Sequence, residues 1–580
     1  MKEQTIPSRS ILILMFGILS TSIFITDQAN AEVSIWATGC TEKIQRDKRS
    51  ELPHNRVWDE QTSTVSVAGL RGEHVPFQLI VTADQVNVSG IALDKTSLQS
   101  GENILSPENV LLYFEHHIKV YTPSGIHGEE GYWPDAIVPL TRPFNIHSGE
   151  RGSPLELRHQ PIWVDILVPS DQPPGIYEGT IGVSSDEGKL GEVNIKLTIW
   201  DATMPAERHY PAIVWIGSND IARIHGLDQE SPEFLELYYK YLELLLSNRI
   251  DPGHIMSLGL EGHIEDGNYV LEWTNHRMEK FLIDNGLLII QISAAPRSIP
   301  HESGEQPFSQ TYTKYTRQYI EQVISYAKTR GWYDRLAFLC PVDEPRTSDE
   351  YEAVRRWASI VKEIDPDIRF SITEQPLPQN PDWGSFVGYA NSWIVHGNIL
   401  ARDEQVQAIA ERQQEGEQVI WYISCDQEYP QPNYFIDREA ADLRMVPWIT
   451  WRYDLGGILY WASTFWREVK DPWIDPVTWK RSECNAPLSG EGTLVYPGNL
   501  VERYTGQENV FGPVSSVRFE LLREGMEELE LMHLLKELGG ETEADRIVES
   551  VCMGIRDFTR DPNAIDEAKE KIVKEILKRQ

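Results

Sequence analysis

The chain has 580 residues, of which 41% are hydrophobic and 10% aromatic, and its formal net charge is −35. This length exceeds one ordinary domain and predicts two or three domains with sizeable cores. So acidic a chain repels phosphate backbones and carries no basic stripe with interleaved aromatics, which argues against nucleic acid as a partner.

The first 31 residues have the pattern of a signal peptide. Lys2 and Arg9 give a positive start, residues 11–25 are mostly apolar, and Ala29-Asn30-Ala31 offers a cleavage site before Glu32. The apolar run is shorter than the roughly 20 residues that span a bilayer, and no later segment has that character. We therefore expect export to the periplasm or the medium, with no stable membrane span once residues 1–31 are removed.

The chain contains five cysteines and no CxxC pair; they are Cys40, Cys340, Cys425, Cys484 and Cys552. An odd number without paired spacing does not indicate a disulfide scaffold, although export would permit one bridge. Cys340 falls in a predicted buried strand, where an inert thiol is expected.

Residues 32–205 have the pattern of an all-β domain. Alternating apolar runs at 74–81, 162–168 and 192–199 are separated by turns such as Pro173-Pro-Gly, as in a β-sandwich. The segment Trp133-Pro134-Asp135 is predicted to be a structural turn rather than a contact with a neighbouring domain.

From residue 206 to 540, predicted strands alternate with long helices. The strands are expected at 212–216, 254–258, 287–293, 336–342, 369–373, 392–396, 418–424 and 457–463. A count close to eight predicts a (β/α)8 barrel of the TIM type. A doubly wound sheet is the weaker alternative, because no glycine-rich strand-to-helix turn marks a nucleotide site.

Two further helical segments complete the predicted fold. Residues 514–535 are expected to form an amphipathic helix that closes the barrel, and residues 541–580 a charged helical tail without chemistry. The sequence thus predicts a multi-domain chain, an all-β sandwich followed by a TIM-type barrel with a C-terminal helical extension.

One predicted barrel strand ends in two adjacent carboxylates. The apolar run from Leu336 leads into Asp343-Glu344-Pro345, and Thr347 with Glu350 has the spacing of a capping box that starts a helix. The two acids therefore lie at the carboxyl end of a strand, which is the catalytic face of an α/β barrel. A carboxylate pair there is costly to desolvate unless it has partners or a purpose.

Consecutive carboxylates favour one particular division of labour. Ordinary glycosidases place two carboxyl groups on opposite sides of the sugar, usually from different strands. Neighbouring acids suit cleavage assisted by the 2-acetamido group of an N-acetylhexosamine, which itself attacks the anomeric carbon. In this hypothesis Glu344 is the general acid and base, and Asp343 orients the acetamide.

Aromatic and polar residues near other strand ends are candidates to bind the sugar. Because side chains alternate along a strand, only about half of them are expected to face the barrel interior. The candidates are Trp215, Asn391, His396, Trp421, Tyr422, Tyr460, Trp461 and Trp466. Glu374 and Asp426 follow other strands and are alternative nucleophiles. The sequence has no HExxH, calcium-loop, GxSxG or P-loop motif, so neither a metal nor an organic cofactor is expected.

Several motifs also resemble one known family, glycoside hydrolase family 123. They are Gly131-Tyr-Trp-Pro-Asp135, Gln160-Pro-Ile-Trp-Val-Asp165, Pro173-Pro-Gly-Ile-Tyr-Glu-Gly179, Asp343-Glu344-Pro345, Arg444 with Trp448 and Trp451-Arg-Tyr453, Gly457-Ile-Leu-Tyr-Trp461, and Ser516-Val-Arg-Phe-Glu-Leu-Leu-Arg-Glu-Gly525. The resemblance implies a β-sandwich followed by a barrel. It also implies retaining, acetamido-assisted cleavage of terminal β-linked N-acetylgalactosamine, with Asp343 as stabiliser and Glu344 as acid and base.

The residues and the resemblance together predict an exported glycoside hydrolase of the β-N-acetylhexosaminidase type, acting on a glycan or glycoconjugate. Two alternatives remain open. One is a glycosidase of another specificity that uses a separate carboxylate nucleophile. The other is a protein that binds glycans without cleaving them.

Overall fold

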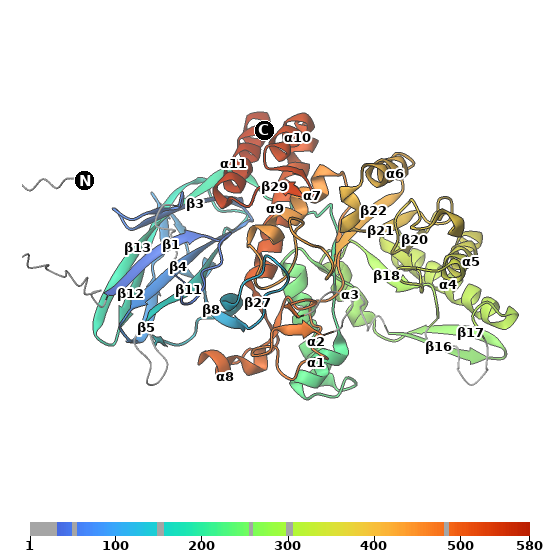
Figure 1. The fold of residues 1–580 in the computed structure, drawn as a ribbon, viewed down its shortest axis with the longest axis horizontal. Helices are drawn as coiled ribbons and strands as arrows, with labels where there is room; N and C mark the ends of the chain where they lie inside the picture. Colours follow the sequence, from blue (N-terminus) through green and yellow to red (C-terminus); the bar gives the residue numbers. More distant parts are fainter. Residues whose placement is uncertain (1–31, 49–54, 148–155, 254–258, 297–305, 481–486) are drawn as a thin grey trace, which may run out of the picture.

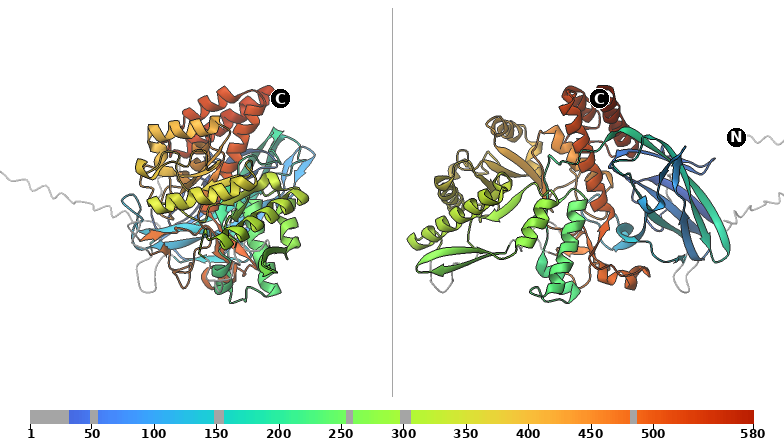
Figure 2. Two further views of the ribbon diagram at one scale, coloured as in Figure 1. Left: turned by 90° about the vertical axis from the view of Figure 1, so that its right-hand side faces the viewer. Right: turned by 180° about the vertical axis from the view of Figure 1, so that it is seen from behind.

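A computed structural model describes residues 32–48, 55–147, 156–253, 259–296, 306–480 and 487–580. The predicted signal peptide (1–31) and the predicted strand 254–258 lie outside the described residues. A sheet-rich region, a barrel and a set of C-terminal helices are visible, with the helices between the other two (Figure 1). The view from behind in Figure 2 gives the same order. None of the helices in the described ranges is long and apolar enough to cross a membrane.

The N-terminal region is a sandwich of two mainly antiparallel sheets. One sheet has the order β1-β4-β11-β8-β9-β27-β26 and the other β10-β5-β12-β13-β3-β2. Alternate residues of the long strands point into the core between the sheets, for example Phe77, Leu79 and Val81 on β4. The longer strands are β1 (Glu32–Gly39), β3 (Thr64–Arg71), β4 (His74–Asp84), β5 (Val88–Lys95), β8 (Val110–Val120), β9 (Gly131–Pro139), β11 (Leu157–Leu167), β12 (Gly175–Ser185) and β13 (Gly188–Thr203), and the short ones are β2 (Trp58–Asp59) and β10 (Phe144–Ile146).

The central region is a nearly closed barrel of eight parallel strands, as predicted. The order is β15-β14-β23-β22-β21-β20-β19-β18, and no ladder joins β15 to β18 among the described residues. Seven of the eight expected strands coincide with observed ones, and the second is observed at Asp251–Gly253, just before the predicted range. The strands are β14 (Ala212–Trp215), β15 (Asp251–Gly253), β18 (Ile290–Ser293), β19 (Leu336–Leu339), β20 (Arg369–Ile372), β21 (Ser392–His396), β22 (Gln418–Ile423) and β23 (Ile458–Tyr460).

Helices surround the barrel and begin where the sequence supplies capping residues. The Ser231 hydroxyl caps α2 by accepting from Phe234 N–H, and the Thr347 hydroxyl caps α5 by accepting from Glu350 N–H. Gly331 ends α4 in the left-handed conformation that glycine adopts without strain. The helices of the barrel are α1 (Ser218–His225), α2 (Pro232–Ser247), α3 (His276–Asp284), α4 (Gln310–Arg330), α5 (Ser348–Ile364), α6 (Asp403–Gln414) and α7 (Ala441–Arg452).

The segment predicted as an amphipathic closing helix differs from expectation. It begins as strand β27 (Pro513–Ser516), which pairs with β9 of the sandwich and with β26 (Tyr496–Pro497). Helix α9 (Val517–Glu537) follows and is buried on nearly all sides, including its charged residues. The reason is its position between the sandwich and the barrel (Figure 1), where both neighbours cover it.

Buried ion pairs join α9 to the sandwich. Arg518 donates from Nε and Nη2 to the two carboxylate oxygens of Asp135, each at 2.7 Å, and neither side chain is exposed. Asp135 lies on strand β9, so its segment is a strand that reaches the neighbouring region. The expectation of a structural turn there is wrong, because residues 131–139 pair as a strand and the partner of Asp135 comes from the distant helix α9.

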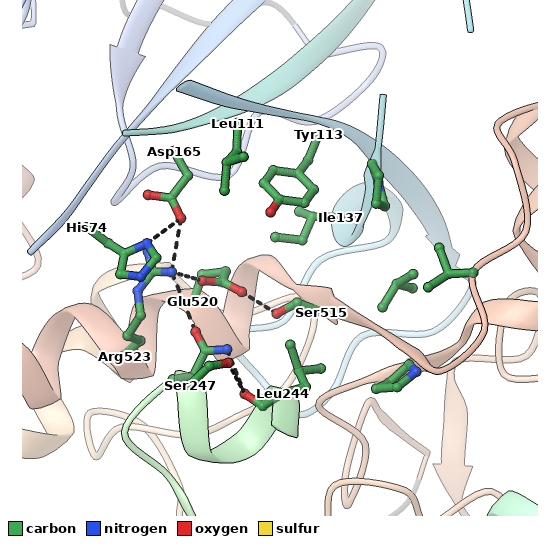
Figure 3. A pocket seen from close by; sticks show the side chains of 15 residues that line it. His74, Leu111, Tyr113, Ile137, Asp165, Leu244, Ser247, Ser515, Glu520 and Arg523 are labelled. Carbon is green, nitrogen blue, oxygen red and sulfur yellow. Dashed lines mark hydrogen bonds and ion pairs between the residues drawn. The ribbon is translucent and has the colours of Figure 1, made fainter. Parts of the chain in front are cut away.

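A second charged group lines a cavity of about 190 Å³ between the sandwich, α2 and α9 (Figure 3). His74 Nδ1 lies 2.9 Å and Arg523 Nη1 3.1 Å from the same oxygen of Asp165, and Arg523 also pairs with Glu520. Burial would raise the pKa of Asp165, but the charges of Arg523 and His74 lower it to about 2. These charges neutralise one another, so the cavity is a feature of the interface rather than a site of reaction.

The C-terminal tail is helical but not a separate cap. Helices α10 (Glu541–Glu549) and α11 (Pro562–Arg579) pack on α9, with a short hairpin of β28 (Cys552–Gly554) and β29 (Asp557–Phe558) between them. Lys569 of α11 pairs with Glu73 of the sandwich, so the tail also fastens the two ends of the chain together.

Candidate active site

The consecutive acids Asp343 and Glu344 lie at the carboxyl-terminal face of the barrel. Strand β19 ends at Leu339, and helix α5 begins at Ser348, so the acids occupy the connection between them. The predicted capping box is present, since the Thr347 hydroxyl accepts from Glu350 N–H and the Glu350 carboxylate accepts from the backbone N–H groups of Arg346 and Thr347. This capped turn fixes the chain direction immediately after the acids.

Thr373 links the two acids. It follows β20, and its hydroxyl donates to Asp343 Oδ1 at 2.7 Å and accepts from Glu344 N–H at 2.9 Å. One side chain from the neighbouring strand therefore sets both the orientation of the Asp343 carboxylate and the backbone of Glu344.

Glu344 has an unusual backbone conformation and is held by contacts with Thr373, Tyr422 and Arg346. Its φ is +41°, a value that non-glycine residues seldom adopt. Tyr422 on β22 donates its hydroxyl hydrogen to Glu344 Oε1, and Arg346 Nη2 lies 2.6 Å from Oε2. The Arg346 side chain is 73% exposed, so an incoming ligand can displace it without unfolding anything.

The electrostatics of Asp343 differ from those of an ordinary surface aspartate. Although part of the residue is exposed, loss of water around its carboxyl raises the pKa, Thr373 opposes this by donating to it, and the charge of Glu344 raises it further. The Asp343 carboxyl therefore has a fixed hydrogen-bond donor in Thr373, and it ionises at higher pH than an ordinary aspartate.

A second polar group lies beside Tyr422. His396, the last residue of β21, accepts from Asn398 N–H at Nδ1, so its Nε2 carries the hydrogen toward Asp426 Oδ1 at 2.9 Å. The Ser424 hydroxyl also donates to Asp426, at 2.7 Å. Burial would raise the pKa of Asp426, but His396 and Ser424 lower it to about 2, so this carboxylate stays ionised.

Glu374 lies behind the acids and is only 4% exposed. Burial raises its pKa to about 7, against the opposing hydrogen bonds from Gln375 N–H and Tyr351. A nucleophilic carboxylate has to be ionised, so Glu374 is poorly suited to that role below neutral pH.

The aromatic candidates divide by the direction in which they point. Tyr422 belongs to the small apolar cluster that fills the barrel, and Trp215 packs against it. Trp461 lies just past β23 and donates its Nε1 hydrogen to Glu491, whose pKa burial raises to about 7. With His396, these are the predicted residues that the structure places at or near the carboxyl-terminal face.

The remaining candidates lie elsewhere. Trp421 points outward and donates to Thr450 of α7. Tyr460 packs on Tyr434 outside the barrel, and its hydroxyl donates at 3.3 Å to the same Glu491 carboxylate that Trp461 contacts. Trp466 is fully buried against Tyr241 of α2.

Asn391 lies at the opposite end of the barrel from the predicted sugar site. It precedes β21 and bonds Phe370 N–H and Ile368 C=O at 2.8 and 3.0 Å, so it lies at the amino-terminal end of the strand. The predicted strand 392–396 already placed Asn391 just before its start, so its choice as a residue of the carboxyl-terminal face was wrong.

The sequence did not single out Thr373 and Arg346, which contact the acids, or Glu491, which accepts from Trp461 and Tyr460. The positions of Thr373, the last residue of a predicted strand, and of Arg346, two residues beyond Glu344, were usable signals for the carboxyl-terminal face. Glu491 had none, because it follows the last strand by about thirty residues. In the described residues, one group of His and Glu side chains has the spacing to hold a metal ion, and it comprises His209, His533 and Glu537. His209 precedes β14, which places this group on the opposite side of the barrel from Asp343.

Comparison with known proteins decides the family. Residues 297–535 match the sequence profile of the glycoside hydrolase 123 catalytic domain, and residues 44–185 match that of the glycoside hydrolase 123 N-terminal domain. The chain belongs to glycoside hydrolase family 123. The resemblance seen in its motifs is thereby confirmed, and membership of family 123 makes the protein a glycosidase with a glycan substrate.

Solved structures support the fold of this family 123 protein. A family 123 glycoside hydrolase from Clostridium perfringens, studied for glycolipid glycan hydrolysis, superimposes with a TM-score of 0.70 at 14% identity, over 94% of this chain and 98% of its own. A family 39 glycoside hydrolase from Bacteroides cellulosilyticus WH2 gives a TM-score of 0.31 at 10% identity, over 75% and 80% of the two chains, which is too slight a likeness to carry an argument. No curated protein sequence matches the chain significantly.

Proposed function

We propose that this family 123 glycosidase removes terminal β-linked N-acetylhexosamine, with N-acetylgalactosamine as the expected sugar, by a retaining mechanism assisted by the substrate's acetamide. The observation that carries the proposal is the pair Asp343 and Glu344, adjacent in the chain and both fixed by Thr373. Two carboxyl groups so close in the chain suit a substrate that supplies its own nucleophile.

In the first step the acetamide oxygen attacks the anomeric carbon and the glycosidic bond breaks. Protonated Glu344 gives its proton to the departing oxygen. Ionised Asp343 accepts a hydrogen bond from the acetamide N–H and stabilises the positive charge of the forming ring. In the second step Glu344 removes a proton from water, and this water attacks the same carbon and reopens the ring. Two inversions at one carbon give net retention of configuration.

The two carboxyl oxygens of Glu344 have different surroundings. Tyr422 holds one carboxyl oxygen from inside the barrel, so the other oxygen faces Arg346 and solvent. An aglycone that occupies the Arg346 side separates this exposed ion pair, whose loss costs little, and leaves Glu344 free to carry the proton.

A separate carboxylate nucleophile remains the second candidate, and one observation favours it. Asp426 is ionised at every working pH because His396 and Ser424 hold its pKa at about 2. Both of its oxygens have partners, however, because His396 and Ser424 contact Oδ1 and Asn398 donates to Oδ2 at 3.2 Å. We therefore place it second to the acetamide mechanism.

The first test is hydrolysis of aryl and alkyl N-acetyl-β-galactosaminides by wild type, Glu344→Gln and a matched control. Glu344→Gln should lose about 10²- to 10⁴-fold on an alkyl leaving group, and much less on a dinitrophenyl group that needs no proton. Asp349→Asn, an exposed acid in the first turn of α5, should keep the wild-type rate. A Glu344→Gln rate within a few-fold of wild type on both substrates would remove Glu344 as the acid.

The second test separates the two mechanisms. Asp343→Asn should lower the rate on N-acetylgalactosaminides and leave any residual activity on plain galactosides unchanged, because only the former present an acetamide. Equal losses on both substrates, together with inactivity of Asp426→Asn, would favour the separate nucleophile.

We also propose that the protein is exported with cleavage before Glu32. Support comes from the signal-like residues 1–31 and from Cys425, which is disulfide-bonded, as export permits. Intact mass of the protein recovered from the periplasm or medium should correspond to a chain that begins at Glu32. A cytoplasmic protein that retains Met1 would contradict export.

A further inference from the structure

Two histidines and a glutamate from distant parts of the chain meet on the amino-terminal side of the barrel. His209 belongs to the connector between β13 and β14, and His533 and Glu537 lie at the end of α9. One ligand atom of each residue lies within 4.8 Å of those of the other two. No step proposed for Asp343 and Glu344 uses these side chains.

The spacing on α9 suits joint coordination of one ion. His533 and Glu537 are four residues apart and so share one face of the helix. His533 Nε2 lies 3.8 Å from Glu537 Oε1. The His209 ring stacks on that of His533 with its centroid 3.8 Å away, so the His533 ring has to turn out of this stack for both imidazoles to coordinate one ion.

A buried carboxylate fixes His209 from behind. Glu530 is 1% exposed, and its Oε2 lies 2.8 Å from the ring nitrogen Nδ1 of His209. Its Oε1 accepts from the backbone N–H of His209, also at 2.8 Å. The Oε2 contact assigns the hydrogen to Nδ1 and leaves Nε2 available to a ligand. A carboxylate behind a histidine is the usual support of a metal-binding imidazole.

His533 has a ring nitrogen that no neighbouring group in the described ranges satisfies. Its Nδ1 is buried without a hydrogen-bond partner among the described residues.

We propose that His209, His533 and Glu537 bind a divalent transition metal of the zinc class, which fastens the connector between sandwich and barrel to α9. Two imidazole nitrogens and one carboxylate oxygen suit zinc and exclude magnesium and calcium, which take oxygen ligands. Ligand atoms around tetrahedral zinc are about 3.3 Å apart. The Glu537 side chain is 56% exposed and can rotate to close the difference.

The metal is structural, since it lies on the side of the barrel away from Asp343. It ties the residues just before β14 to the helix that carries the interface ion pairs. Because the ion binds only when connector and helix are both in place, it should stabilise the folded state.

The test uses the full chain, produced without a polyhistidine tag and stripped with a chelator. Zinc binding is measured by titration calorimetry, cobalt(II) binding by visible absorption, and the melting temperature with and without zinc. The variants are Glu537→Gln, an exposed change that leaves folding intact, and His533→Ala. The control is His263→Ala, an exposed histidine on the β16 (Leu260–Glu265) hairpin.

Wild type and His263→Ala should bind one zinc ion per chain and melt at higher temperature with zinc. Glu537→Gln should bind at least about tenfold more weakly, and His533→Ala should lose both the cobalt absorption and the zinc-dependent shift. Wild type that binds no zinc, or variants that bind it as tightly as wild type, would overturn the proposal. Glycosidase activity is not the readout, so this result is independent of the function proposed above.

Discussion

The hydroxyl of Thr373 donates a hydrogen bond to Asp343 Oδ1 at 2.7 Å. This bond favours the ionised carboxylate and opposes the burial and the Glu344 charge that raise its pKa. The mechanism requires Asp343 ionised in the free enzyme, so the acidic limb of kcat/KM should report this group.

Replacing Thr373 by Val should therefore move the acidic limb to higher pH. Loss of the donor raises the pKa of Asp343, so ionisation, and with it activity, begins at higher pH. The hydrogen bond is one to a charged group, which predicts a loss of about 10- to 100-fold in kcat/KM at the optimum. The pH profile of N-acetylgalactosaminide hydrolysis measures both effects.

Thr373→Ser, which keeps the hydroxyl, is the matched control and should restore the wild-type limb. A Val variant whose acidic limb stays in place would show that Thr373 does not act on Asp343.

Tyr422 and Trp421 are neighbours on β22 that point to opposite sides of the barrel wall. Tyr422→Phe removes the hydroxyl that donates to Glu344 and should lower kcat/KM by about 10- to 100-fold, with the melting temperature little changed. Trp421→Phe should do the reverse, because it leaves a void beside α7 and removes the bond to Thr450. A loss of about 1–3 kcal/mol in unfolding free energy with kcat/KM near wild type is expected.

Denaturant unfolding and steady-state kinetics on the same two proteins separate these outcomes. Similar kinetic losses in both variants would mean that the direction of the two side chains does not decide their roles.

The same pair illustrates what the sequence could and could not predict. Apolar runs and turn residues placed the strands and the barrel, because burial and capping are local properties. Alternation along β22 showed that one of Trp421 and Tyr422 faces inward, but the choice depends on register against the neighbouring strands. Asp343 and Glu344 were found at the expected face, since the carboxyl end of a strand is also a local feature.

Long-range partners explain the features that the sequence did not predict. The charges of α9 resemble a solvated helix face, but their partners, such as Asp135 for Arg518, come from the sandwich nearly four hundred residues earlier. Strand β27 likewise pairs with β9 across a comparable separation. The strand-end position of Thr373 indicated the face of the barrel, but its role was missed because that role depends on neighbours that only the fold brings together.

The Asp135–Arg518 pair should contribute far more than a surface pair. Asp135→Asn leaves a fully buried guanidinium without its charge partner and should cost about 3–5 kcal/mol of unfolding free energy. The control is Glu236→Gln, which breaks an exposed pair with Arg277 and should change the unfolding free energy very little. Urea unfolding of both variants measures the difference, and equal small losses would contradict the structural role of α9.

Gly525 on α9 is explained by close helix packing. A Cβ atom added there would lie 2.5 Å from Arg444 C=O and 2.9 Å from Pro447, both on α7. Gly525→Ala should therefore separate α7 from α9 and cost about 1–3 kcal/mol, although alanine favours the helix itself. Gly539→Ala, in open space just beyond α9 but at positive φ, is a control for backbone strain without a clash. Thermal unfolding that shows Gly525→Ala as stable as wild type would contradict this packing.

The most direct test of the proposed mechanism is a crystal structure of the protein with the thiazoline analogue of N-acetylgalactosamine, which mimics the cyclised acetamide. The acetamide-assisted mechanism predicts an Asp343 carboxylate oxygen about 2.7–2.9 Å from the ring nitrogen, with Glu344 beside the anomeric carbon on the side where the aglycone departs. A complex in which the ring nitrogen meets Asp426 or solvent, and Asp343 makes no contact with it, would contradict the account.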